Sequence, residues 1–219
     1  MLTLYGVYRS RATRNVWLMN ELGLPFTHVP VIQGYRLADP AAPDAPLNTT
    51  SPAFLAINPA GQVPCIVDDG LVLSESLAIN LYLAKKHGGP LAARDSAEEA
   101  QMMQWALFGA TQIEQTALDI YYPYADGTVH TPDGAARIAA AAEKLARPVA
   151  TLNAHLAATG HVVGVRFTVA DINMAEIIRY ASAHQPLMQA NPLVTGWLAA
   201  CQTRPAFQQM WAARTAEPA

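Results

Sequence analysis

The pattern of apolar residues changes near residue 90, and this change constrains the fold more than any other feature of the chain. Before it, short apolar runs typical of strands alternate with helical patterns. Asp68-Asp69-Gly70 separates the last two runs and predicts a hairpin. The expected strands cover residues 2–7, 26–31, 63–67 and 71–73, and the expected helices cover residues 11–22 and 74–87.

This order of elements predicts a small mixed sheet. A helix between the first two strands implies that they run parallel, whereas the hairpin adds an antiparallel pair. We therefore expect an α/β first domain with a sheet of about four strands. Residues 33–50 lie between the second and third strands, and their prolines predict a loop with at most one helical turn.

The rest of the chain is predicted to be a helical bundle. Apart from a short apolar run at residues 161–165, its patterns are helical. Two helix starts have the spacing of a capping box, Ser96 with Glu99 and Thr168 with Asp171. Glycine, proline and charged residues are frequent in residues 85–95, between the mixed and the helical part of the chain. The predicted domains are residues 1–84 and 96–219, joined by a linker at 85–95.

Composition narrows the class of protein. Of the 219 residues, 52% are hydrophobic and 14% are charged, against about 25% charge in an average soluble domain, so we expect a folded core and no disorder. The net charge of −3 gives no basic surface for nucleic acid or an anionic membrane. The first nine residues lack the pattern of a signal peptide. These features favour a soluble cytoplasmic protein.

Neither the cysteines nor any other residues suggest a metal site. Cys65 and Cys201 lie far apart in the sequence and form no CxxC pattern. Cys65 has apolar neighbours, which favours a buried strand residue over a redox centre. We expect no bound metal and no disulfide chemistry.

Ser10 is the first candidate for chemistry, because it lies where the first strand leads into the first helix. At such a position a hydroxyl is placed beside free backbone amides and the positive end of the helix dipole, which suits an anion. The alternative is that Ser10 only caps the helix. Position in the sequence leaves both interpretations open.

Two further segments have a functional and a structural interpretation. A cis Val63–Pro64 bond would turn the backbone of Val63 outward to pair with an extended peptide, whereas a trans bond would make Pro64 an ordinary loop proline. Glu75 and Ser76 begin a helix, where they would either cap it or bind an ammonium and a carboxylate. Gln62, next to Val63, adds an amide donor.

Together these segments resemble the cytosolic glutathione transferase family. The resemblance rests on Leu-Tyr-Gly-x-x-x-Ser-x-x-x-Arg, Glu-Leu-Gly-Leu-Pro-Phe, Asn-Pro-x-Gly-Gln-Val-Pro, Ser-Glu-Ser-Leu-Ala-Ile and Phe-Thr-Val-Ala-Asp-Ile, which span essentially the whole chain. It implies a thioredoxin-like first domain, an all-α second domain and a homodimer. It also implies a cis Val63–Pro64 bond and a purely structural role for Thr168 and Asp171.

The resemblance further implies roles in binding glutathione, the co-substrate, with no other cofactor. Val63 would pair with the cysteinyl backbone, Glu75 and Ser76 would hold the γ-glutamyl end, and Gln62 would reach towards the glycyl carboxylate. Ser10 falls on the serine that activates the thiol in serine-using classes. The function expected is transfer of the glutathione thiolate to a small hydrophobic electrophile.

The sequence leaves several residue assignments and one alternative function open. Tyr8 is an alternative donor to the thiol, and with Phe108 and Gln112 it is a candidate contact for the electrophile. In the proline-rich segment, Asn48 and Thr49 are candidate glutathione contacts. The alternative function is a non-catalytic glutathione-binding or regulatory module of the same fold.

Overall fold

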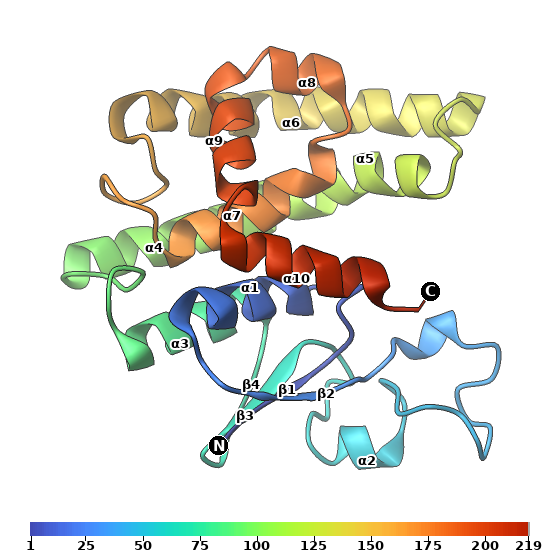
Figure 1. Cartoon of the computed structure of the whole chain (residues 1–219). Coiled ribbons are helices and arrows are strands. Elements are labelled where there is room, and N and C mark those ends of the chain that lie inside the picture. The colour runs from blue at the N-terminus through green and yellow to red at the C-terminus, as the bar shows by residue number, and fades with distance from the viewer. Residues whose placement is uncertain (219) are drawn as a thin grey trace. The chain divides into compact units, whose positions relative to one another are not determined.

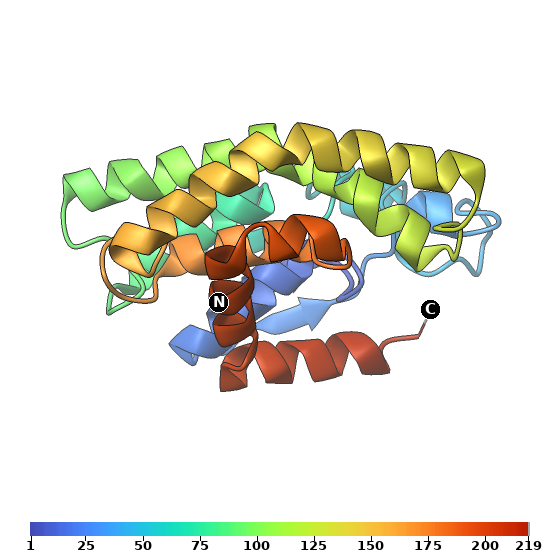
Figure 2. The same ribbon diagram turned by 90° about the horizontal axis from the view of Figure 1, so that it is seen from above.

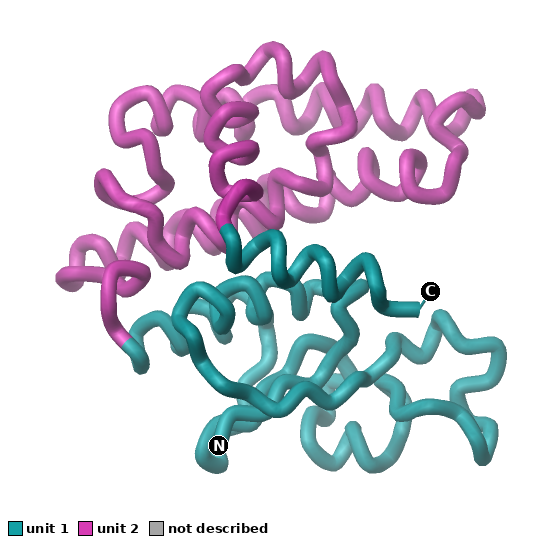
Figure 3. Tube along the Cα trace, in the orientation of Figure 1, with its two compact units in different colours: residues 1–87, 205–219 teal, residues 88–204 magenta. Residues whose placement is uncertain are grey.

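The computed structural model describes residues 1–218, and its contacts divide the chain into two compact units (Figure 3). The first unit contains Met1–His87 and the last helix, α10 (Pro205–Ala216), and the second contains Gly88–Arg204. The last helix thus belongs with the first unit, whereas the sequence placed it in residues 96–219. The reason is that α10 packs along the first helix of the chain.

The first unit contains the mixed four-stranded sheet that the sequence predicted (Figure 1). Its strand order is β2-β1-β3-β4. β1 pairs in parallel with β2 and antiparallel with β3, and β3 pairs antiparallel with β4. The strands are β1 (Leu2–Tyr5), β2 (Thr27–Val29), β3 (Cys65–Asp68) and β4 (Leu71–Ser74).

Helix α1 (Ala12–Leu22) lies at the centre of the helical layer of this unit. It contacts both α3 (Ser76–His87) and α10, so its residues 12–19 are all buried. Trp17 packs edge-on against Phe207 of α10, with their ring centroids 4.9 Å apart. This packing explains why α10 joins the first unit.

The connection between β2 and β3 is mostly loop, as predicted. It contains one short turn of 3-10 helix, η1 (Gly34–Arg36), and the four-residue helix α2 (Pro52–Leu55). Phe54 of α2 is fully buried with Val31 and Cys65. The loop is therefore anchored to the sheet through an apolar side chain near its end.

The second unit consists of helices and turns in the described residues. α4, the π-helical segment η2 and α5 follow one another without a break (Figure 2). Gly109 begins η2, and a Cβ there would lie 2.7 Å from Cδ1 of Ile177, so the missing side chain lets this segment approach α7 closely. The elements are α4 (Ser96–Phe108), η2 (Gly109–Glu114), α5 (Gln115–Ala125), α6 (Pro132–Thr159), α7 (Val169–Ile178), η3 (Arg179–Ala181), α8 (Gln185–Gln189) and α9 (Pro192–Gln202).

One local detail differs from the sequence-based expectation. Asp95, rather than Ser96, caps α4, and its carboxylate accepts hydrogen bonds from the backbone of Ala97 and Glu98, each at 2.9 Å. Residues 161–165, the short apolar run noted in the sequence, form bends and turns. No helix within residues 1–218 has the length and apolar composition of a membrane span.

Thr168 and Asp171 form a capping box at the start of α7. Asp171 Oδ2 accepts a hydrogen bond from the backbone of Thr168 at 2.8 Å, while Oδ1 accepts from the backbone of Val162 at 3.0 Å and from Nε1 of Trp197 at 2.9 Å. A fully buried carboxylate is tolerated here because it accepts hydrogen bonds on both oxygens. Asp171 thus connects the start of α7 to the segment before it and to α9.

Two glycines in helices of this unit offer a matched test of packing. A Cβ on Gly134 would lie 2.1 Å from the carbonyl oxygen of Thr128, whereas a Cβ on Gly196 would meet no atom within 4 Å. We expect Gly134→Ala to lower the free energy of unfolding by about 1–3 kcal/mol through overpacking. Gly196→Ala should raise it by roughly 0.5–1 kcal/mol through helix propensity. Thermal and urea unfolding of both variants tests this, and equal effects of the two substitutions would contradict it.

Candidate active site

Ser10 lies in the turn between β1 and α1, and its hydroxyl both donates and accepts a hydrogen bond. Its Oγ donates a hydrogen bond to the carbonyl oxygen of Val7 at 2.6 Å and accepts one from the backbone of Ala12 at 3.1 Å. Ser10 therefore does stabilise the start of α1. To bond a sulfur atom, its hydroxyl hydrogen must turn away from Val7.

Two backbone amides of this turn already have a carboxylate as partner, whereas the sequence led us to expect free amides here. The carboxylate of Glu217, in the segment after α10, accepts hydrogen bonds from the backbone of Tyr8 at 2.8 Å and of Arg9 at 2.7 Å. The sequence gives no sign of this contact, because 208 positions separate Glu217 from Arg9. The anion bound at this turn is therefore the carboxylate of Glu217, a group of the protein itself.

Gly6 explains why Val63 lies beside the same turn. A Cβ on Gly6 would lie 3.3 Å from the Cβ of Ala12 and 3.4 Å from the Cβ of Val63. Its φ of +144° also favours glycine. The Val63–Pro64 peptide bond is cis, as the resemblance implied. The start of α1 and the residues before β3 therefore meet across Gly6.

Gln62 and Val63 follow a tight turn that is fixed by Asn58. The side-chain amide of Asn58 donates to the carbonyl oxygen of Gln62 at 2.8 Å. Gly61 has a φ of +59°, and a Cβ there would lie 2.8 Å from the carbonyl oxygen of Thr49, so only glycine fits. Gln62 itself is exposed, and Val63 is half-buried.

Ser76 is tied to α1 by a buried network of polar side chains. Nη1 of Arg14 donates to the Oγ of Ser76 at 3.1 Å, and Nδ2 of Asn15 donates to its carbonyl oxygen at 2.9 Å. Asn80 accepts from Asn15 at 2.7 Å and donates to the carbonyl oxygen of Arg14 at 3.1 Å. The guanidinium of Arg14, only 1% exposed, thus lies behind the first residue of α3.

Glu75 precedes Ser76 in an uncommon backbone conformation. Its φ is +70°, in the left-handed region that costs a non-glycine residue about 1–2 kcal/mol. The side chain is exposed while Ser76 is buried. Such strain is typical of positions where the surrounding structure aims a side chain at a ligand.

Tyr8 packs its ring edge-on against His28, with the ring centroids 4.8 Å apart. Burial, and then the charge of Glu217, raise the pKa of the Tyr8 phenol above its usual value. The phenol therefore keeps its proton at neutral pH and can donate a hydrogen bond.

Cys65 lies in β3, next to Pro64, and is fully buried. Burial raises the pKa of its thiol to about 11, so the thiolate that redox chemistry needs is scarce at neutral pH. Within residues 1–218, no group of three or more histidine, cysteine, aspartate or glutamate side chains could hold a metal ion.

Asn48 and Thr49 have structural roles in the proline-rich loop. The side-chain amide of Asn48 donates to the carbonyl oxygens of Pro40 and Pro46, each at 3.0 Å, while its Oδ1 accepts from the backbone and the hydroxyl of Thr50. The hydroxyl of Thr49 accepts from the backbone of Gly34 at 2.8 Å. Asn48 is buried and its hydrogen bonds are made within the loop, so the structure gives it no role in a binding site.

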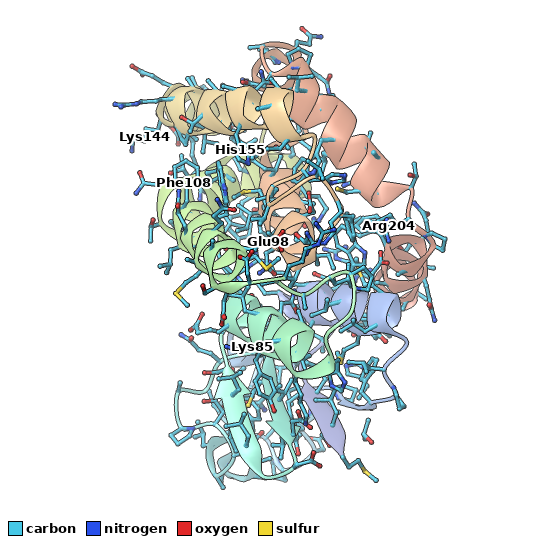
Figure 4. All side chains as sticks on the ribbon, turned by 90° about the vertical axis from the view of Figure 1, so that its left-hand side faces the viewer. Lys85, Glu98, Phe108, Lys144, His155 and Arg204 are labelled. Carbon is cyan, nitrogen blue, oxygen red and sulfur yellow. The ribbon has the colours of Figure 1, made fainter. Side chains whose placement is uncertain are left out.

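Phe108 and Gln112 belong to the second unit. Phe108 ends α4 and packs edge-on against Trp105 at 5.3 Å, while the ring of His155 on α6 lies 4.7 Å from Trp105 (Figure 4). Gln112 is exposed in η2, where its amide donates to the hydroxyl of Thr111 at 3.3 Å. π-helical segments of this kind occur frequently at functional sites.

The structure thus brings together one group of predicted residues within the first unit. Ser10 and Val63 lie on either side of Gly6, Gln62 adjoins Val63, and Ser76 is linked to α1 by Arg14. Sequence reasoning missed Glu217 and His28. Neither has a motif, and both reach the turn only through tertiary packing.

Comparison with known proteins identifies the family of the chain. Family models of the glutathione S-transferase N-terminal and C-terminal domains match residues 4–91 and 100–205. Glutathione S-transferase 3 of Zea mays is 34% identical over 226 residues, which cover 97% of this chain and 94% of the relative.

Solved structures give the same result. The apo form of glutathione S-transferase III has a TM-score of 0.78 and 35% identity, with 100% of this chain and 99% of that chain covered. The theta class enzyme from Xanthomonas axonopodis pv. citri, solved with glutathione bound, has a TM-score of 0.72 and 30% identity, with 95% of each chain covered. The chain therefore belongs to the glutathione S-transferase family and is a glutathione transferase.

Proposed function

We propose that this glutathione transferase activates the thiol of glutathione with the hydroxyl of Ser10. The observation that carries the proposal is the convergence at Gly6, where the turn bearing Ser10 meets Val63. A tripeptide whose cysteinyl backbone pairs with Val63 would have its sulfur close to the start of α1. Ser10 is the last hydroxyl-bearing residue of that turn before α1 begins at Ala12.

The energy that this activation requires is modest. A free thiol has a pKa near 8.5, and lowering it by about 2 requires roughly 2.7 kcal/mol. A charge-assisted hydrogen bond supplies about 1.5–3 kcal/mol, and the positive end of α1 adds about 0.3–1 kcal/mol. A hydrogen bond from Ser10 and the helix dipole are together sufficient without a general base.

The γ-glutamyl end would be held at the start of α3. The carboxylate would bond to Ser76, and the buried guanidinium of Arg14 behind it favours a negative charge there. The exposed carboxylate of Glu75 would bind the ammonium group. Gln62, exposed beside Val63, would reach towards the glycyl carboxylate.

The remaining features of the proposal follow from the family. The electrophile is a small hydrophobic molecule, and glutathione is the only co-substrate. We propose a cytoplasmic homodimer with a role in detoxification. The edge strand β4 supports self-association, because Leu71 and Val72 are 43% and 46% exposed.

Ser10→Ala should raise the pH at which bound glutathione ionises and lower kcat at neutral pH by roughly 10–100-fold, because one charge-assisted hydrogen bond is lost. The affinity for glutathione should change little, since Val63 and Ser76 are intact. An ultraviolet titration of the bound thiolate and an aryl-halide conjugation assay measure the two effects.

Two matched variants sharpen this test. Ser10→Thr retains the hydroxyl and should keep most of the activity, and Tyr8→Phe should leave the thiolate titration unchanged. A shift with Tyr8→Phe but not with Ser10→Ala would transfer the role to Tyr8. Glutathione binding without turnover in the unmodified protein would favour the non-catalytic module.

Glu75→Gly separates the role of the side chain from that of the backbone. Because φ is +70° at this position, glycine should raise the free energy of unfolding by about 1 kcal/mol. The affinity for glutathione should nevertheless fall about tenfold, because the partner of the ammonium group is lost. Ser74→Ala, one residue earlier, is the control for calorimetric binding. Unchanged affinity in Glu75→Gly would remove Glu75 from the site.

A further inference from the structure

The carboxylate of Glu217 binds the turn that carries Ser10 through two hydrogen bonds. Oε1 accepts from the backbone of Tyr8 at 2.8 Å, and Oε2 accepts from the backbone of Arg9 at 2.7 Å. Each oxygen thus serves one amide, and both distances are those of strong charge-assisted hydrogen bonds. The residue that follows these two amides is Ser10.

A second side chain holds the same turn from the sheet. His28 of β2 lies with its Nε2 2.6 Å from the carbonyl oxygen of Gly6. A carbonyl oxygen only accepts, so Nε2 carries the hydrogen. The turn is therefore fixed before Ser10 by His28 and immediately before it by Glu217.

Glu217 is itself held in place by the packing of α10. Phe207 packs against Trp17 of α1 and stacks on Trp211, with ring centroids 4.9 and 5.6 Å apart. The side-chain amide of Asn20 donates to the carbonyl oxygen of Ala206 at 3.3 Å. Because α10 packs along α1, Glu217, the residue after α10, lies beside the turn.

Glu217 acts on the turn through its negative charge as well as through its hydrogen bonds. It contributes, after burial, to the raised pKa of the Tyr8 phenol, so its field reaches groups beside the turn. A negative charge here opposes the formation of a second anion nearby. Removing the charge and removing the hydrogen bonds should therefore have different effects on a thiolate held by Ser10.

We propose that Glu217 is a positioning residue for Ser10, which fixes the turn so that the hydroxyl is aimed at the thiol of glutathione. This inference rests on the proposed role of Ser10. Glu217 touches neither substrate nor reacting atoms in this assignment. It acts through the backbone of Tyr8 and Arg9.

The experiment is a double-mutant cycle between positions 10 and 217 in the full chain. Glu217→Ala should lower kcat for aryl-halide conjugation about tenfold, as expected for the loss of a well-placed hydrogen bond. The KM for glutathione should stay within about twofold, because Val63 and Ser76 are unchanged. In the Ser10→Ala background the same substitution should have almost no effect on kcat.

Glu217→Gln tests the effect of the negative charge. It also provides a second variant in case Glu217→Ala folds poorly. Its amide oxygen keeps one of the two acceptors, so kcat should stay closer to that of the unmodified protein than in Glu217→Ala. The loss of charge should lower the apparent pKa of bound glutathione by roughly 0.5. Glu143→Gln, on the exposed surface of α6, removes the same charge and should leave the pH profile unchanged.

The other ionisable groups nearby are present in all these variants, so the comparison isolates Glu217. They lie on the turn, on the first turns of α1, on β2 and near the end of α10: Tyr8, Arg9, Arg11, Arg14, His28 and Arg214.

Three results would overturn the inference. In the first, Glu217→Ala lowers the melting temperature but leaves kcat and the pH profile unchanged, so the contact only tethers α10. In the second, the loss of kcat is equally large in the Ser10→Ala background. In the third, Ser10→Ala alone has no effect. Only the third also contradicts the proposed function, so the two failures can be told apart.

Discussion

The close approach at Gly6 is the constraint on which the rest of the first unit depends. The backbone there has a φ of +144° and has the Cβ atoms of Ala12 and Val63 on either side of it. A Cβ at this position would lie tightly against the Cβ of Ala12, at 3.3 Å, and the positive φ would strain any side chain there. Because Ser10 belongs to one of these segments and Val63 to the other, glycine at this position keeps the proposed thiol-activating group close to the backbone proposed to bind the peptide.

Helix α1 also positions Ser76, another candidate residue of the site. Its buried Arg14 and Asn15 bond to Ser76 at the start of α3, so the group proposed to hold the γ-glutamyl end is set by the same helix that follows Ser10. A buried guanidinium is costly unless its donors are satisfied. Its position behind a hydroxyl at a helix start is consistent with a site for a carboxylate.

The contact between Glu217 and the turn changes how the start of α1 is understood. From sequence, the turn resembles a ready-made anion site with free amides. In the structure two of these amides already bond to a carboxylate, and the hydroxyl of Ser10 bonds to Ala12. The proposed stabilisation of a thiolate therefore rests on the hydroxyl hydrogen of Ser10 and the remaining field of the helix, more than on free amides.

Much of this protein is determined by local sequence. The Asp68-Asp69-Gly70 turn, the capping box of Thr168 and Asp171, and the change of pattern near residue 90 depend on neighbouring residues, so the mixed sheet and the helical second unit could be predicted from the chain alone. The motifs around Ser10, Val63 and Ser76 likewise identified the family and a candidate site.

Only the tertiary structure decided which elements meet. It placed α10 against α1 through Trp17 and Phe207, brought Glu217 to the turn before Ser10, and assigned Asn48 to the interior of its loop. These outcomes depend on contacts between residues far apart in the sequence. No periodicity or capping pattern encodes such contacts, because they arise from the burial of apolar faces and the pairing of polar groups once the chain has folded.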